Sequence, residues 1–427
     1  MNALALCCGL AVIAGPPTDV DTLPSIREVS GVRIIQRINR RTDLVAVRLY
    51  LLGGTRQLSD STAGVETLFL HAATLGTEHY PGGLSQRAMA RTGAVEALEP
   101  GVDWTVTGFI TRRQDLDSAW VVFADRLTHP TLDPEAVRQA REEMLSTARR
   151  RYADPDERIR ALADQVAFPD HPYALDPEGT EESLAAISDR DVTEYPRMQL
   201  VTSRMLLVVV GDADTAQVSG LVTHTIGTIQ HGDYRWTLPP ATRQEESHYR
   251  MVRRELPTNY ILGYMVGPPV SSPDYMPFRV ATELLSSRLN ETIRMGMGLS
   301  YAAYAPFVER AVGVAGIYAS TPKPEAVVPI MLDQIRWLLQ TKLDGFGLNR
   351  FVNSFRLEYL SRNDGNANQA DYLARAELYL GDYREADRFL QQLNRVSPDD
   401  VVRVAKRYMR AVQWAYIGDT DRMKDHW

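Results

Sequence analysis

The chain has 427 residues, of which 44% are hydrophobic and 24% are charged, a balance typical of folded globular proteins. A chain of this length can build two sizeable hydrophobic cores. Its net charge is −7 and its Lys and Arg residues are scattered, so the sequence lacks the clustered basic surface of a nucleic-acid-binding protein, and we expect no nucleic-acid partner.

The first segment, residues 1–15, carries no charge and is apolar over most of its length. It is too short to span a bilayer, and the small residues near Ala14 predict a secretory signal with a cleavage point there. We therefore expect an exported, periplasmic protein. Both cysteines, Cys7 and Cys8, lie in this segment, so the mature chain would have no disulfide, thiolate zinc site or cysteine nucleophile.

Residues 24–225 are predicted to form an N-terminal domain. Residues 31–39 and 44–54 alternate between polar and apolar like half-buried antiparallel strands. Five later stretches have helical periodicity: 63–75, 84–92, 115–127, 134–152 and 156–166.

The end of this first half recurs near the end of the chain. The buried strand and turn LLVVVGDAD at 206–214 correspond to QWAYIGDTD at 413–421. Each is preceded by a similar helix start, in which Ser188 and Ser397 are the expected N-caps of acidic first turns. A duplicated helix, strand and turn predict two homologous domains.

The polar segment 226–249 is predicted to be the linker, and residues 250–427 the C-terminal domain. Residues 258–267 predict a strand of that domain, and helices are expected near 274–294, 324–341 and 346–361, with further helix to 409. The expected fold class is α+β, in which each domain packs helices against a mainly antiparallel sheet.

Separated motifs of both halves point to one family. They are GGTRQLSDSTAGVETLFLHAATLGT, DPDERIRALADQVAFPDHPYALDPEGTEESLAAIS and LLVVVGDAD in the first half, and ELLSSRLNETIRMGMGLSYAAYAPF and AGIYAST in the second. In these the chain resembles the pitrilysin/insulinase-type zinc metallopeptidases over nearly its whole mature length. The resemblance implies a mitochondrial processing peptidase-like fold, in which a two-domain chain pairs with another chain into a clam-like shell around a peptide.

Active members of that family carry the inverted zinc motif H-x-x-E-H on their first long helix. Its two histidines bind zinc and its glutamate is the general base toward the metal-bound water. The matching positions here are Thr67, Leu70 and His71, so only the last histidine is kept. The third ligand of the family, a glutamate, aligns with Thr147, and Glu142 and Glu143 lie a turn or more upstream.

One histidine cannot hold a catalytic zinc ion, which needs three protein ligands and an open position. We therefore expect that this chain binds no metal and no cofactor and has no catalytic residue of its own. His71 is expected to be a partly buried histidine with one hydrogen-bond partner.

A rebuilt metal site that combines His71 with Glu66 or His79 is a weaker alternative, because Glu66 lies about 140° around the helix from His71. His79 and His171 are expected to be structural loop residues. The remaining histidines show no ligand spacing, so they add no candidate metal site.

The second half keeps a pair that the family uses. In active relatives an Arg and a Tyr seven residues apart, with Gly-Leu between them, reach the peptide bound over the zinc, and the matching residues here are Arg294 and Tyr301. A guanidinium can hold a peptide carbonyl, and a tyrosine hydroxyl can stabilise developing oxyanion charge. Taken without the resemblance, the same spacing also fits a solvated helix-end arginine and a strand aromatic.

Three neighbours of the pair have separate interpretations. Arg288 also matches a family arginine, and we expect it to be a structural ion-pair partner directed away from Arg294. Tyr304 and Phe307 could line a substrate subsite, although core packing is the commoner fate of strand aromatics.

The combined prediction is the non-catalytic subunit of a heterodimeric zinc endopeptidase. Its partner would be a homologous H-x-x-E-H subunit that holds the zinc, and Arg294 and Tyr301 would complete the partner's site in trans on a peptide or unfolded protein substrate. The alternatives are a purely structural or peptide-binding shell subunit, and an autonomous hydrolase. The regulatory subunit of the mitochondrial processing peptidase is a related model, but its glycine-rich loop is not evident here. Alone, the chain could form a homodimer.

Overall fold

The computed structural model describes residues 23–240, 242–343, 345–363 and 365–424. The predicted signal segment 1–15, with Cys7 and Cys8, lies outside the described residues. Among the residues that are described, no helix is both long and apolar enough to cross a membrane.

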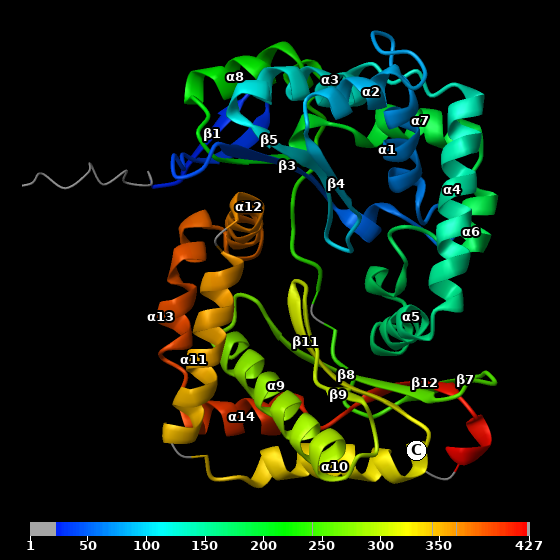
Figure 1. Cartoon of the computed structure of the whole chain (residues 1–427), viewed down its shortest axis with the longest axis vertical. Coiled ribbons are helices and arrows are strands. Elements are labelled where there is room, and N and C mark those ends of the chain that lie inside the picture. Colours follow the sequence, from blue (N-terminus) through cyan, green and yellow to red (C-terminus); the bar gives the residue numbers. More distant parts are fainter. Residues whose placement is uncertain (1–22, 241, 344, 364, 425–427) are drawn as a thin grey trace, which may run out of the picture.

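Each half of the chain builds one six-stranded sheet (Figure 1). In spatial order the first sheet contains β1 (Ser25–Val29), β2 (Val32–Arg37), β6 (Met205–Val210), β3 (Leu44–Leu52), β5 (Trp104–Arg112) and β4 (Val95–Glu99). The second contains β7 (Tyr249–Arg253), β12 (Gln413–Gly418), β8 (Asn259–Pro269), β11 (Val312–Thr321) and β10 (Phe307–Glu309), with β9 (Ala302–Tyr304) paired to β11. Only β2–β6 and β7–β12 pair in parallel among these strands, so the sheets are mainly antiparallel, as predicted.

Helices make up most of the rest. The first half has α1 (Val65–Leu75), α2 (Leu84–Arg91), α3 (Leu116–Thr128), α4 (Pro134–Ala153), α5 (Pro155–Ala167), α6 (Glu181–Ala186), α7 (Asp189–Gln199) and α8 (Thr215–His224). The second has α9 (Tyr275–Leu289), α10 (Pro324–Gln340), α11 (Gly345–Arg362), α12 (Asn366–Arg375), α13 (Phe389–Leu393) and α14 (Pro398–Tyr408). The predicted α+β fold class is therefore confirmed.

The repeat seen in the sequence is a repeat in the structure. The order β2-β6-β3-β5-β4 in the first sheet corresponds to β7-β12-β8-β11-β10 in the second, so β6 and β12 occupy corresponding places. The glycines that follow the two repeated strands, Gly211 and Gly418, have φ angles of 144° and 152°. A Cβ there would lie 2.5 Å from the Leu44 carbonyl oxygen and 2.2 Å from Asn259 Oδ1, so both turns require glycine.

The helix starts that precede these strands are also equivalent. Ser188 caps α7 and Ser397 caps α14, and each hydroxyl accepts a hydrogen bond from the backbone N–H three residues later, at Asp191 and Asp400. The aspartate in turn accepts from the backbone N–H of its serine, which completes a capping box at both places. The predicted N-caps are confirmed.

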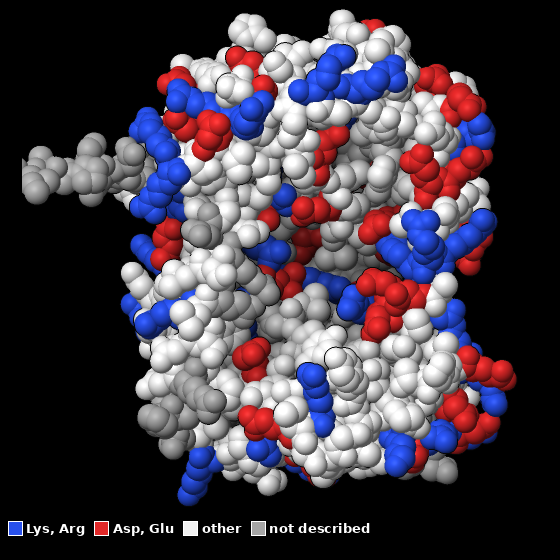
Figure 2. Space-filling model, in the orientation of Figure 1, with Lys and Arg blue, Asp and Glu red and all other residues white. Residues whose placement is uncertain are grey.

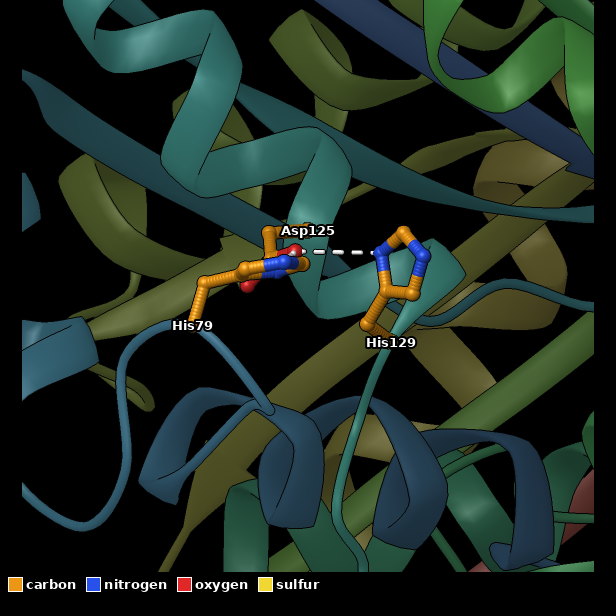
Figure 3. A group of neighbouring side chains, drawn as sticks. All are labelled: His79, Asp125 and His129. Carbon is orange, nitrogen blue, oxygen red and sulfur yellow. Dashed lines mark hydrogen bonds and ion pairs between the residues drawn. The ribbon is translucent and has the colours of Figure 1, made fainter.

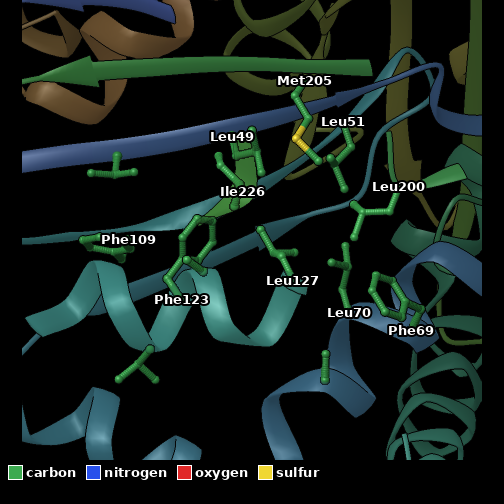
Figure 4. Packing of buried hydrophobic residues seen from close by; sticks show 14 of the residues in the cluster. Leu49, Leu51, Phe69, Leu70, Phe109, Phe123, Leu127, Leu200, Met205 and Ile226 are labelled. Atoms are coloured by element: carbon green, nitrogen blue, oxygen red, sulfur yellow. The ribbon is translucent and has the colours of Figure 1, made fainter. Parts of the chain in front are cut away.

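One face of each sheet is covered by helices of its own half. In the first half, Phe123 and Leu127 of α3 lie against Leu49 and Phe109 of the sheet, as Figure 4 shows. The side chains form one continuous buried cluster that also includes α1. This packing fixes the position of α1, which carries the degenerate zinc motif.

The opposite face of each sheet is covered by a helix from the other half (Figure 1). Ile159 and Leu162 of α5 pack with Leu262 of the second sheet. Leu373 of α12 packs with Leu206 of the first sheet. The two domains thus exchange one helix each, and separating them would expose two apolar sheet faces to water.

A buried carboxylate joins the domains at the centre of this arrangement. Asp103, which is 3% exposed, accepts hydrogen bonds from the Tyr173 hydroxyl at 2.8 and 2.9 Å and from the Tyr379 hydroxyl at 2.8 Å. It also accepts from the Ala311 backbone N–H at 3.1 Å. Burial and the neighbouring carboxylate raise the pKa of both tyrosines, so they remain protonated and donate.

Between α8 and β7, the described residues 229–240 and 242–248 form no regular strand or α-helix. They lie within the predicted linker 226–249. Trp236 anchors this segment to the two domains. Its indole N–H donates to the Leu378 carbonyl at 2.8 Å, and its ring lies under the Arg56 guanidinium. The linker is therefore packed against both domains.

We expect Asp103→Ala to lower the free energy of unfolding by about 3 kcal/mol, because it leaves buried donors from both domains without an acceptor. Urea unfolding measures this loss. The matched control is Asp60→Ala at an exposed aspartate, for which little change is expected. Equal unfolding midpoints for the Asp103 and Asp60 variants would show that the buried carboxylate does not hold the domains together.

Candidate functional site

The degenerate zinc positions lie on α1 and are used for packing. Thr67 is buried, and its hydroxyl donates to the Pro177 carbonyl at 3.0 Å. Leu70 belongs to the hydrophobic cluster under the sheet (Figure 4). At the positions of the first ligand and the general base, the chain therefore has a hydroxyl engaged with backbone and an apolar core residue.

His71 is half-buried beside α4. Burial lowers its pKa, and the nearby carboxylate of Glu143 opposes that shift. The predicted partial burial is confirmed. No hydrogen bond of the ring is found to the described residues, so the expected partner stays a prediction. Thr147, at the position of the family's third ligand, accepts a hydrogen bond from the Arg150 guanidinium at 2.8 Å.

Glu66 is not available for a rebuilt metal site. Its carboxylate is buried and accepts from the Tyr195 hydroxyl at 2.6 Å and from the Arg204 guanidinium at 3.0 Å. This buried pair joins α1 to α7 and to the start of β6. The residues at this place do not fit a catalytic zinc ion, which needs three ligands converging on one point.

Two of the other histidines have different surroundings from each other. His171 has the predicted structural role, since its Nδ1 accepts from the Tyr173 backbone N–H at 3.1 Å and its ring packs on Phe168. His79 lies in a loop, as expected, and its ring lies beside Asp125 and His129 (Figure 3). That group was missed because its members are far apart in sequence, and the only local signal is the four-residue spacing of Asp125 and His129.

The Arg/Tyr pair is brought together in the C-terminal domain. Arg294 lies in the π-helical turn Asn290–Gly296 that ends α9, and Tyr301 immediately precedes β9. The Arg294 guanidinium lies 4.9 Å from the centre of the Tyr301 ring. Both side chains are exposed, Tyr301 to 84%, so neither is a packing residue.

The loop between the two residues is held in place by β11. Gly298 has a φ of 62°, which supplies the reversal after the π-helical turn. The Ser300 hydroxyl donates to the Ser320 carbonyl at 2.7 Å, and the Thr321 hydroxyl donates to the Leu299 carbonyl at 2.6 Å. Tyr301 is therefore presented to solvent from an anchored backbone.

Arg294 and Tyr301 line a pocket of about 940 Å³ between α9, β9 and the start of α11. Arg288 lines the same pocket. The predicted ion pair of Arg288 is not found among the described residues. Its guanidinium instead lies 4.5 Å from the Trp337 ring centre and donates to Gln334 at 3.2 Å. The pocket thus combines arginines and aromatic residues with the carboxylates of Glu283 and Glu291.

Tyr304 and Phe307 differ in exposure and in the residues that they contact. Tyr304 is 36% exposed, lines the pocket and packs on Tyr318. Phe307 is half-buried against Tyr275 and Phe278, so it belongs to the core. Only Tyr304 has the position of a subsite residue.

We expect His71 to weaken the fold in acid. Because burial lowers its native pKa below the ordinary value of about 6.5, the unfolded chain binds the proton first, and the free energy of unfolding falls as the pH drops below about 6.5. His71→Gln removes this dependence. Urea unfolding of both proteins between pH 7 and pH 5 measures it, and curves that stay parallel would contradict the burial of a neutral imidazole.

Comparison with known proteins identifies two matches that follow each other along the chain. Residues 33–176 match the model of insulinase, peptidase family M16, and residues 186–354 match the peptidase M16 inactive domain. The mitochondrial-processing peptidase subunit beta of Lentinula edodes is 22% identical over 435 residues, covering 96% of this chain and 92% of the relative.

Two further similarities concern a complex subunit and a solved structure. Cytochrome b-c1 complex subunit 1 of Mus musculus is 21% identical over 284 residues, covering 65% of this chain and 59% of the relative. A protease from Helicobacter pylori has the same fold, with a TM-score of 0.84 at 17% identity over 92% of this chain and 100% of that one. With its two matched domains and this fold, the chain belongs to the insulinase family of metallopeptidases, peptidase family M16.

Proposed function

We propose that this chain is the non-catalytic subunit of a heterodimeric zinc endopeptidase. It binds the peptide substrate and supplies Arg294 and Tyr301 to the active site of a homologous H-x-x-E-H subunit. The observation that carries the proposal is the asymmetry between the two domains: the metal positions are absorbed into packing, whereas the Arg/Tyr pair is exposed at a pocket.

The N-terminal domain supports the first part of the proposal. Thr67 and Leu70 cannot replace a zinc ligand and a general base, and Thr147 offers no carboxylate at the third position. We therefore place the zinc ion in the partner subunit and none in the degenerate motif of this chain.

The C-terminal domain supports the second part. An extended peptide has carbonyl oxygens that accept hydrogen bonds, and the Arg294 guanidinium presents several donors on one plane. The Tyr301 hydroxyl is an exposed donor next to it that could reach an oxyanion forming in a neighbouring subunit. The aromatic wall, which includes Trp337 and Tyr304, would take up substrate side chains.

Relatives support a partner subunit. The printed names of two similar proteins describe subunits, one of the mitochondrial-processing peptidase and one of the cytochrome b-c1 complex. The similarity to a cytochrome b-c1 complex subunit favours a different candidate. In that case the chain would be a shell subunit that stabilises its partner or binds peptides without a role in cleavage. The exposure of Arg294 and Tyr301 favours the first candidate, because a shell has no need of an unpacked pair at a pocket.

We expect peptide hydrolysis only when this chain is mixed with its H-x-x-E-H partner. In the mixture, Tyr301→Phe removes one donor to the developing oxyanion and lowers kcat about 100-fold, with little change in KM. Arg294→Ala removes a substrate contact and raises KM. Initial rates over a range of peptide concentrations measure both effects.

Matched controls come from exposed residues elsewhere, Arg190→Ala and Tyr249→Phe, which should leave both constants unchanged. Analytical ultracentrifugation shows whether each variant still binds the partner. If the Arg294 and Tyr301 variants form the complex and match the unsubstituted rate, the chain is a shell subunit. A partner that is fully active alone would lead to the same conclusion.

We also propose export to the periplasm, on the basis of the apolar segment 1–15. Expression of the full chain in a bacterium with two membranes should place a shortened form in the periplasmic fraction. Its N-terminus, read by mass spectrometry, should begin just after Ala14 or Gly15. A full-length chain retained in the cytoplasm would contradict export.

A further inference from the structure

We propose that His79, Asp125 and His129 form a binding site for a divalent transition-metal ion on the N-terminal domain (Figure 3). His79 Nδ1 lies 2.7 Å from Asp125 Oδ1, and His129 Nδ1 lies 3.1 Å from the same oxygen. The three atoms lie within 4.8 Å of one another. Atoms that share one zinc ion at about 2.0–2.1 Å in a tetrahedron are roughly 3.3 Å apart, so small movements bring these three to one ion.

The carboxylate is already held in place. Asp125 is buried near the end of α3, and its second oxygen accepts a hydrogen bond from the buried Thr77 hydroxyl. A ligand that is oriented by a hydrogen bond from a neighbouring residue loses less freedom when it binds a metal.

The backbone fixes the two histidines as well. The Glu78 N–H donates to the His129 carbonyl at 3.0 Å, and the Thr131 N–H donates to the Gly76 carbonyl at 3.2 Å. Thr77 and Pro130 form an isolated bridge between these bonds. The loop after α1 and the loop after α3 are therefore paired before any ligand is added, which places the two imidazoles on either side of Asp125.

The metal-binding atoms of the three side chains determine which ions the site prefers. Two imidazole nitrogens and one carboxylate oxygen suit zinc and its neighbours in the first transition row better than magnesium or calcium, which prefer oxygen ligands alone. The His79 side chain is 64% exposed and that of His129 is 46% exposed, so water can complete the coordination. Each imidazole would bind through Nδ1 and carry its remaining proton on Nε2.

This site is separate from the degenerate zinc motif of the family. His71 lies within α1 beside Glu143 of α4, whereas His79 lies beyond the end of α1 and contacts α3. A metal ion here would hold the loop that follows α1 against the end of α3. The metal ion would stabilise the N-terminal domain. The prediction that the chain binds no metal would then hold only for the positions of the family's zinc motif.

The competing interpretation is a metal-free cluster in which both imidazoles donate to one carboxylate. The two interpretations differ in a direct binding measurement. Isothermal titration of zinc chloride into the full chain, with Cys7→Ser and Cys8→Ser to remove the thiols, should show one ion bound per chain. The same protein should melt a few degrees higher with zinc than with a chelator.

The His79→Ala and His129→Ala variants should each bind zinc at least about tenfold more weakly and lose the zinc-dependent rise in melting temperature. Both histidines are partly exposed, so these variants keep the fold, which circular dichroism checks. The controls are His224→Ala, at an exposed histidine of α8, and His71→Ala in the family motif, and both should bind zinc like the parent. No bound zinc in the parent, or equal binding by all four variants, would overturn the proposal. Because the readout needs neither partner nor peptide, it is independent of the proposed peptidase role.

Discussion

The exchange of α5 and α12 is the constraint on which the rest of the structure depends. Each sheet has one face packed by its own helices and another packed by a helix of the opposite domain. The Asp103 carboxylate lies where these two packings meet and accepts hydrogen bonds from both halves. The relative position of the domains is therefore set by burial of apolar surface and by polar contacts that include Asp103 and ion pairs such as Arg310–Asp164. The linker adds to it through Trp236.

The residues at the family's motif positions are packed differently in the two domains. Figure 2 shows charged side chains around the hollow between the domains, and both domains contribute to its surface. In the N-terminal domain, α1 is held by the buried Glu66–Arg204 pair, and Leu70, at the position of the family's general base, packs in the core. In the C-terminal domain, Arg294 and Tyr301 remain free of packing at a pocket. This difference between the domains is the basis of the proposal that the chain binds a substrate.

The sequence predicted the fold where a local signal existed. The helical periodicity placed the five helices from α1 to α5 within a few residues, and the repeated Gly-Asp turn placed β6 and β12. β4 and β5 were not predicted. β4 is a short, exposed edge strand, and β5 has threonines at buried positions, so neither shows a clear alternation of polar and apolar residues. The exchange of helices has no local signal, since it depends on which sheet face an amphipathic helix meets.

The candidate site could be predicted only in part for the same reason. The family resemblance pointed to Arg294 and Tyr301, but their stacking and the shared pocket with Arg288 depend on the π-helical turn and on Trp337, which is distant in sequence. The Glu66–Arg204 pair and the His79, Asp125 and His129 group join residues from separate elements. Such groups appear only when the chain is folded.

Photo-crosslinking in the assembled complex tests directly whether this chain contacts the substrate. Position 301 would carry a photoreactive phenylalanine analogue, and the partner would have its catalytic glutamate replaced so that a labelled peptide stays intact. We expect that irradiation transfers the label to this chain, and that excess unlabelled peptide prevents the transfer. Label found only on the partner subunit, in a complex that binds the peptide, would contradict a role of this chain at the substrate.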